Sequence, residues 1–290
     1  MDDLVLHGAT RTQLEALVRT PPQAILLAGP DGAGKTTVAT ALAASLLELR
    51  SQDLASYPYF LAIRPEGASI SIEAIRSLQK FLQLKSTGSN TLRRAVIIES
   101  SHALTAEAQN AYLKLLEEPP ADTVMILTAT TPRALLQTIL SRLQVVTVRA
   151  PSKDDLQPLL AASQKTAEEK NQAYLLSGGL PGLLVALLGD EQAHPLLASV
   201  AHAKQVLAGT PFERLALVEQ LSKQKEDAAR LTEALERIAQ AGMQGAAARS
   251  DTSKIRQWHR VRVCALAARQ SLEKSGNAKL TLTNLFLQMG

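Results

Sequence analysis

The segment at 29–36 reads GPDGAGKT and fits the pattern G-x-x-x-x-G-K-[ST] in full. An apolar run, AILLA at 24–28, precedes it, and a helical stretch, KTTVATALAASLLEL at 35–49, follows it. A glycine-rich turn between a strand and a helix lets backbone N–H groups converge on phosphate oxygens, and the helix dipole favours the anion. A chance glycine-rich turn is the competing interpretation. The flanking strand and helix favour a phosphate loop.

The loop predicts specific roles for its last residues. Lys35 is placed to reach the β- and γ-phosphates, and the Thr36 hydroxyl is placed to coordinate Mg²⁺. We therefore predict binding of ATP or ADP with Mg²⁺. The residues predicted to hold the nucleotide are Gly29, Asp31, Gly32, Ala33, Gly34, Lys35, Thr36 and Thr37.

The first half of the chain alternates short apolar runs with helical segments. The runs are 24–28, 59–63, 94–98, 124–128 and 145–148, and the helical segments include 71–84 and 105–117. Fully apolar strands separated by helices are typical of a parallel sheet covered on both faces. Thr105 is the expected N-cap of one helix, with Glu107 in its first turn, and Pro119-Pro120 ends it.

After Pro151 the strand patterns cease and only helical segments follow, with breaks expected near 209–211, 242–245 and 275–277. We predict three parts: an α/β nucleotide-binding domain at 1–150, a small helical lid at 151–190, and an all-α domain at 191–290. The chain has 290 residues, which is long enough for this organisation. One cysteine, Cys264, excludes internal disulfides and any four-cysteine zinc site, and no apolar stretch is long enough to span a membrane. We expect a cytoplasmic protein.

Three further stretches resemble one family. They are YPYFLAIRPEGASISIEAIRSL at 57–78, AEAQNAYLKLLEEPP at 106–120 and LLQTILSRLQVV at 135–146. Their order and spacing resemble the clamp-loader ATPases of the AAA+ class, specifically the bacterial DNA polymerase III delta-prime and gamma/tau subunits. The resemblance runs from Gly8 to Gly182. It implies a P-loop AAA+ domain, a helical lid and a C-terminal collar that assembles with other subunits.

The resemblance also exposes a departure at VIIESSHALT, residues 96–105. The family's acidic pair falls on Glu99 and Ser100, and His102 fits the gamma-type pattern. Glu99 is expected to help hold Mg²⁺, as Thr36 does, but a serine hydroxyl cannot act as a general base near neutral pH. Glu107 and Glu117 are the alternative acids, and both lie far along the following helix. We expect lost or very slow hydrolysis.

Two more features bear on the nucleotide. The family often places Arg or Lys after Pro-Gly in the lid, where this chain has Leu183, while Thr130 falls at the family's sensor threonine. A threonine at a strand end is also common as a simple cap. The family's four-cysteine zinc module has no counterpart here, so no zinc is expected.

Ser141-Arg142 matches the Ser-Arg of the family's Ser-Arg-Cys motif, with Leu143 in place of the cysteine. The resemblance implies that Arg142 is an arginine finger, which acts on the nucleotide of a neighbouring subunit. An ordinary surface arginine is the alternative. An intact finger beside a defective water-activating site describes a delta-prime-like role.

The last forty residues carry seven Lys or Arg against two acids. Trp258, Val261, Ala265, Ala268 and Leu272 share one helical face, which is either core or subunit interface. Because no aromatic residues interleave the charges, we interpret them as a solvated face in preference to a DNA site.

The resemblance implies gamma/tau-like and delta-like subunits, a sliding clamp and primed DNA as partners. The main alternative is an active gamma/tau-type motor subunit. A small-molecule kinase predicts an Arg-rich lid, which the segment 153–189 lacks, and a scaffold that never exchanges its nucleotide is a further alternative.

Overall fold

The computed structural model describes residues 4–67, 69–87, 91–189, 195–274 and 276–289. The chain divides into two compact units, Met1–Asp155 and Leu156–Gly290. The boundary after Asp155 lies close to residue 150, the expected end of the α/β domain. The division of the second half into a lid and a C-terminal domain stays a prediction.

The first unit is built on a five-stranded parallel sheet with the order β2-β3-β4-β1-β5. Its strands are β1 (Ala24–Ala28), β2 (Phe60–Ile63), β3 (Arg94–Ile98), β4 (Thr123–Ala129) and β5 (Gln144–Thr147). Every residue of β1, β3 and β4 is buried. These are the apolar runs that the sequence predicts as strands, and the parallel sheet of the predicted AAA+ fold is confirmed.

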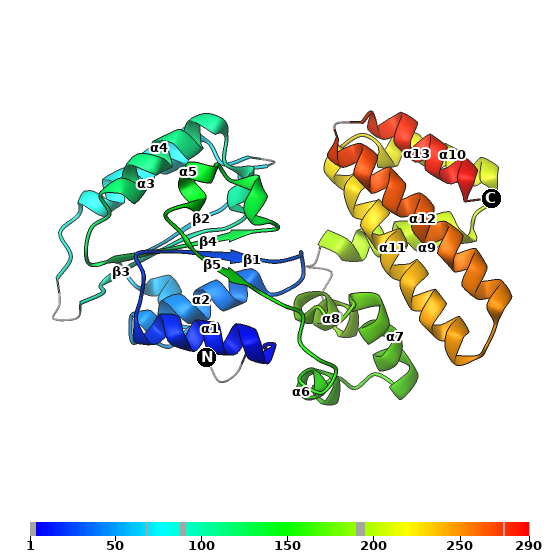
Figure 1. Cartoon of the computed structure of the whole chain (residues 1–290), viewed down its shortest axis with the longest axis horizontal. Coiled ribbons are helices and arrows are strands. Elements are labelled where there is room, and N and C mark those ends of the chain that lie inside the picture. The colour runs from blue at the N-terminus through cyan, green and yellow to red at the C-terminus, as the bar shows by residue number, and fades with distance from the viewer. Residues whose placement is uncertain (1–3, 68, 88–90, 190–194, 275, 290) are drawn as a thin grey trace. The chain divides into compact units, whose positions relative to one another are not determined.

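Helices cover both faces of this sheet. Figure 1 shows α1 (Gly8–Arg19) and α2 (Lys35–Leu46) on one face, with α3 (Ile72–Gln83), α4 (Ala106–Glu117) and the short α5 (Gln137–Leu140) on the other. Three 3₁₀ turns complete the unit: η1 (Leu54–Ser56), η2 (Ser101–Ala103) and η3 (Pro132–Ala134). The Thr105 hydroxyl accepts a hydrogen bond from the Ala108 N–H at 3.2 Å, which confirms the predicted N-cap of α4.

A buried ion pair joins the amino ends of β3 and β4. The Arg94 Nε lies 3.5 Å from Asp122 Oδ2, and Arg94 also donates to the Leu82 carbonyl at the end of α3. Both residues are buried. Burial alone raises the pKa of Asp122, but the hydrogen bond from Ser86 and the charges of Arg94 and Arg93 outweigh it and hold that pKa below its usual range.

This geometry predicts an acid-sensitive contribution to stability. At pH 7, Asp122→Asn should lower the free energy of unfolding by about 3 kcal/mol, because Arg94 stays buried without its counter-charge. Because the native pKa is lowered, the contribution is complete above about pH 4 and is lost as the pH falls through the native value. Urea unfolding at pH 7 and at pH 3 measures both effects. Asp53→Asn is the matched control, since it breaks an exposed pair with Arg50 and should cost under about 1 kcal/mol; equal losses in the two variants would contradict the prediction.

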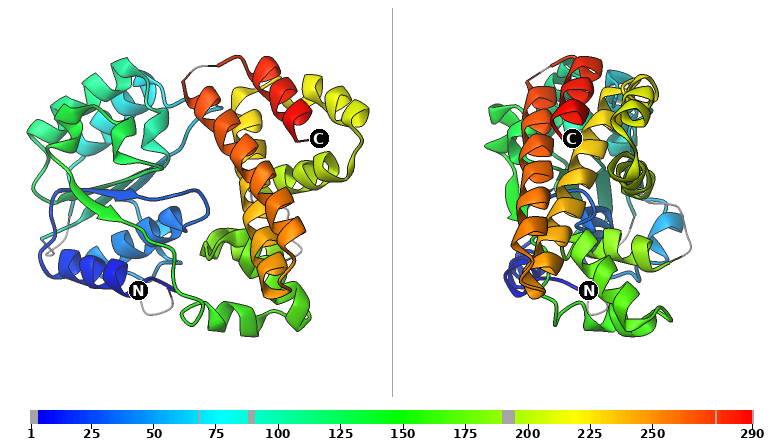
Figure 2. Two further views of the ribbon diagram at one scale, coloured as in Figure 1. Left: turned by 45° about the vertical axis from the view of Figure 1, so that its right-hand side comes forward. Right: turned by 90° about the vertical axis from the view of Figure 1, so that its right-hand side faces the viewer.

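The second unit is helical. Its elements are α6 (Gln157–Ala162), α7 (Ala167–Ser177), α8 (Pro181–Leu188), α9 (Pro195–Ala208), α10 (Pro211–Leu221), α11 (Lys225–Ala248), α12 (Thr252–Glu273) and α13 (Ala278–Gln288). Figure 2 shows α11 and α12 as two long helices packed side by side. Val261, Ala265, Ala268 and Leu272 are buried in the core of this unit, and Trp258 packs against it. The shared face of α12 is therefore core.

The helix break expected at 242–245 is wrong, because α11 runs through it without interruption. A Cβ at position 242 would lie 2.4 Å from the Trp258 ring, so Gly242 leaves room for the indole instead of ending the helix. The breaks expected at 209–211 and 275–277 fall between helices, although residue 275 lies outside the described residues. No helix in the described part of the chain is both long and apolar enough to cross a membrane.

Candidate functional site

The phosphate loop joins the carboxyl end of β1 to the first residue of α2. The Gly29 N–H donates to the Ala129 carbonyl at 3.1 Å, and a Cβ at this position would lie 2.7 Å from the Val148 carbonyl oxygen. Gly32 and Gly34 have positive φ angles of 82° and 78°. Glycine is therefore required by close packing at the first position and by left-handed backbone at the other two.

Lys35 lies folded against the loop. Its Nζ donates to the Gly29 carbonyl at 2.8 Å and the Pro30 carbonyl at 2.9 Å, and lies 3.3 Å from Asp31 Oδ1. The side chain is only 10% exposed. The ammonium charge is thus held at the start of α2, where the helix dipole also favours an anion.

Glu99 connects the loop to the neighbouring strands. The Thr36 hydroxyl donates to Glu99 Oε2 at 3.4 Å, across 63 residues of sequence, and Arg64 Nε donates to Glu99 Oε1 at 2.8 Å. The Glu99 side chain is 17% exposed and that of Arg64 is 71% exposed. The hydroxyl and carboxylate oxygens are the ligand types that Mg²⁺ prefers, so this pair fits the cation of a bound nucleotide.

The turn after Glu99 is fixed by Thr128 on β4. Ser100 has left-handed backbone with φ of 50°, and its N–H donates to the Thr128 hydroxyl at 2.9 Å. The buried Ser101 hydroxyl donates to the Thr128 carbonyl at 2.9 Å. These contacts hold the segment rigidly beside the loop. They place a hydroxyl, not a carboxylate, at position 100.

His102 lies close enough to the loop to sense its charges. Burial of part of the ring lowers the pKa of His102, while the charge of Asp31 opposes this shift and that of Lys35 reinforces it. The lowered pKa favours the uncharged form of the imidazole.

Thr130 follows Ala129, the last residue of β4, whose carbonyl accepts a hydrogen bond from the Gly29 N–H. Thr130 thus lies at the same edge of the sheet as the phosphate loop, where the sequence expected a sensor residue. Glu107 is exposed in the first turn of α4. Glu117 is engaged elsewhere, as an ion-pair partner of Arg142.

Arg142 lies at the amino ends of the strands, whereas the phosphate loop lies at their carboxyl ends. Arg142 precedes β5, whose residue Gln144 pairs with Ile25 at the start of β1, whereas the loop follows the end of β1. A five-residue strand spans about 16 Å, so Arg142 cannot reach the phosphate loop of its own chain. Its guanidinium donates to the Thr138 carbonyl at 2.9 Å and to Glu117 Oε1 at 3.2 Å, and its side chain is 39% exposed.

The structure therefore brings together the predicted loop residues with Glu99 and places Arg142 apart from them. Sequence analysis missed Arg64 and Thr128. Arg64 directly follows the predicted strand at 59–63, and a charged residue at the carboxyl end of a parallel strand is the signal that identifies it. Thr128 was hidden within an apolar strand.

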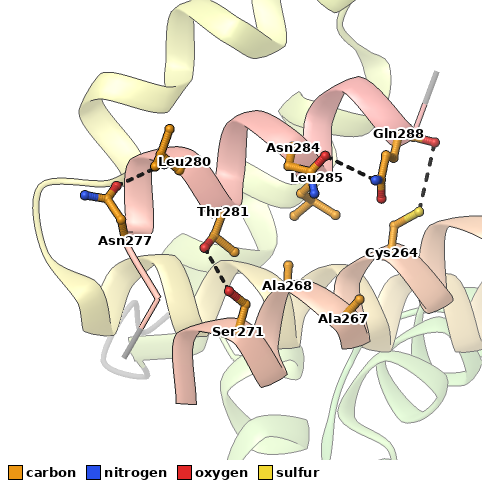
Figure 3. Close-up of a pocket in the computed structure, with 10 residues that line it drawn as sticks. All are labelled: Cys264, Ala267, Ala268, Ser271, Asn277, Leu280, Thr281, Asn284, Leu285 and Gln288. Atoms are coloured by element: carbon orange, nitrogen blue, oxygen red, sulfur yellow. Dashed lines mark hydrogen bonds between the residues drawn. The ribbon is translucent and has the colours of Figure 1, made fainter. Parts of the chain in front are cut away.

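The second unit offers different chemistry. Leu183 on α8 is fully buried. Its aliphatic side chain carries no charge and cannot take the place of the family's Arg or Lys at a phosphate. No group of three or more His, Cys, Asp or Glu that could hold a metal lies within the described ranges. A pocket of about 440 Å³ lies between α12 and α13, and Figure 3 shows the residues that line it. It is lined by apolar, hydroxyl and amide side chains, with Cys264 near the Gln288 carbonyl, and carries no charged group for a nucleotide.

Comparison with known proteins places the chain among replication proteins. Residues 11–152 match the model of the family described as DNA polymerase III, delta subunit. The chain is 32% identical over 212 residues to DNA polymerase III subunit delta' of Pseudomonas aeruginosa, covering 65% of this chain and 64% of that protein. It is 26% identical over 254 residues to DNA polymerase III subunit tau of Bacillus subtilis, covering 81% of this chain and 45% of that protein. The chain thus spans less than two thirds of either relative.

A crystal structure of a DNA polymerase III gamma subunit-related protein from Thermotoga maritima has a similar fold. Its TM-score is 0.50 at 23% identity, and the match covers 97% of this chain and 98% of that one. At this identity the likeness concerns the fold alone. It includes the helical second half, which the family model does not cover.

Proposed function

Because this chain belongs to the delta-prime family of DNA polymerase III subunits, we propose that it binds ATP or ADP with Mg²⁺ at the phosphate loop. The observation that carries the proposal is the complete loop, with Lys35 folded onto it and Thr36 beside Glu99. In this assignment Lys35 neutralises the β- and γ-phosphates, and the oxygens of Thr36 and Glu99 hold the cation. Thr130 lies at the same edge, as a sensor-like residue.

We further propose that the subunit hydrolyses ATP slowly or not at all. Two features support this: Ser100 provides no general base, and one oxygen of the adjacent Glu99 carboxylate is already bound by Arg64.

The nucleotide site and Arg142 together suggest the role of the chain in an assembly. A subunit with little turnover of its own and an exposed Arg142 contributes to the nucleotide of a neighbour in a clamp-loading assembly. The proposed partners are gamma/tau-like and delta-like subunits, a sliding clamp and primed DNA. The second candidate is an active gamma/tau-type motor, which the similarity to subunit tau and the Thr36–Glu99 contact favour.

ATP turnover separates the two candidates. The purified chain, alone and assembled with partner subunits and primed DNA, is expected to show negligible turnover at its own site. Ser100→Glu should raise turnover within the assembly on the order of a hundredfold, because a general base contributes about that much. Steady-state phosphate release measures this, with thermal unfolding as the fold check, since position 100 has left-handed backbone. Ser77→Glu, at an exposed serine of α3 outside the site, serves as the matched control. Robust wild-type hydrolysis that requires Lys35 would favour the motor instead.

A further inference from the structure

The turn between α11 and α12 and the first three turns of α12 are rich in positive charge. Residues 249–262 contain five Lys or Arg and one acid, which gives this segment a net charge of +4. The whole chain has the same net charge of +4, so the remaining residues carry equal numbers of acidic and basic side chains. We call this cluster the basic tip. Its members are Arg249, Lys254, Arg256, Arg260 and Arg262.

The turn brings the two helix ends together. The N–H groups of Arg249, Ser250 and Asp251 donate to carbonyls of the last turn of α11, at 3.1, 3.0 and 3.0 Å. These bonds fix Arg249 beside the first residues of α12. All five side chains of the basic tip are exposed.

Acidic side chains leave two cations of the basic tip, Arg249 and Arg256, without a paired charge within the described residues. Asp251 is occupied at the start of α12, where Oδ1 accepts from the Lys254 N–H at 3.0 Å and Oδ2 lies 3.8 Å from Lys254 Nζ. Glu236 of α11, whose charge interacts with that of Arg262, is paired with Arg269 at 3.0 Å. Arg249 is the C-cap of α11, where the helix dipole favours a cation, but a cation near the start of α12, such as Lys254 or Arg256, gains nothing from the dipole of that helix.

We propose that the basic tip binds the phosphate backbone of duplex DNA without reading its sequence. Four of its five cations are arginines, whose planar fork matches phosphate oxygens. The nearest aromatic ring, Trp258, is packed over Gly242 and is not free to stack on a base. Contacts are therefore confined to phosphates, which position a protein on DNA but carry no sequence information. The sequence alone favoured a solvated face; the structure adds Arg249 to the cluster and shows its one acid to be occupied.

The basic tip lies in the second unit, whereas the proposed nucleotide site lies in the first. DNA binding by the tip and nucleotide binding by the loop can therefore be tested, and can fail, separately. The test measures binding of a fluorescent mixed-sequence duplex by anisotropy between 50 and 200 mM salt. In Arg249→Gln/Arg256→Gln, the slope of log K against log salt should fall in magnitude by about 2, because each lost phosphate contact removes about 0.9. Binding at the lower salt should weaken at least tenfold.

The matched control is Lys225→Gln/Arg230→Gln. It removes the same charge from exposed residues near the start of α11, which lie about 36 and 29 Å along the helix from Arg249. Its affinity and slope should stay within twofold of the wild type. Arg249→Lys/Arg256→Lys keeps the charge and should keep the slope, which separates lost contacts from lost folding. Nucleotide affinity should be unchanged in all three variants.

Equal slopes for the wild type and the Gln variant would overturn the proposal. So would equal losses in the Gln variant and its control, because net charge alone would then explain binding. The Gln variant is also tested with anionic lipid vesicles. If it binds the duplex as the wild type does but no longer binds the vesicles, the proposal is overturned and the basic tip binds a membrane surface instead.

Discussion

Lys35→Ala is expected to weaken ATP and ADP binding by at least about a hundredfold, or about 3 kcal/mol. The structure holds the ammonium group directly against the loop, through the carbonyls of Gly29 and Pro30. Charge-assisted hydrogen bonds to phosphate are among the strongest in proteins, and the partly buried position strengthens them. Isothermal titration with and without Mg²⁺ measures the loss.

The same experiment needs a control for the fold, because Lys35 also braces the loop. Lys80→Ala removes an exposed lysine from the last turn of α3 and should leave nucleotide affinity unchanged. Thermal unfolding of both variants without nucleotide should differ little from the wild type. Undiminished binding in Lys35→Ala would mean that the loop does not hold the nucleotide.

Arg142→Ala is expected to lower ATP turnover at one interface of the reconstituted assembly on the order of a thousandfold, through the loss of an arginine finger. The structure supports action on a neighbour, since Arg142 lies at the edge of the sheet away from its own loop. The chain's own nucleotide affinity should be unchanged. Its free energy of unfolding should fall by less than about 1 kcal/mol, because the pair with Glu117 is exposed.

Two further variants sharpen this result. Arg142→Lys should rescue only partly, because an ammonium group cannot reproduce the planar fork. Arg133→Ala removes another exposed arginine from the first unit and should leave turnover unchanged. Unaffected turnover and clamp loading in Arg142→Ala would make Arg142 an ordinary surface charge.

The sequence by itself determined the elements of the first unit. Apolar runs bounded by turns specified all five strands. The signal is clearest for β1, β3 and β4, because every residue of these strands is buried and the hydrophobic run is continuous. The phosphate loop was equally clear, since its glycines are imposed by local backbone geometry: Gly32 and Gly34 need positive φ. The N-cap Thr105 was predictable for the same reason, as a contact within four residues.

Only the tertiary structure decided which side chains meet. Ile63 pairs with Ile98 across β2 and β3, so the next residues, Arg64 and Glu99, lie side by side although 35 residues separate them. The helical half shows the same limit, because Gly242 continues α11 only where Trp258 packs over it. Strand order, register and helix packing join residues distant in the chain. No local pattern of propensity or hydrophobicity encodes those pairings, and they assign Arg64 to the candidate site and Arg142 to the opposite edge of the sheet.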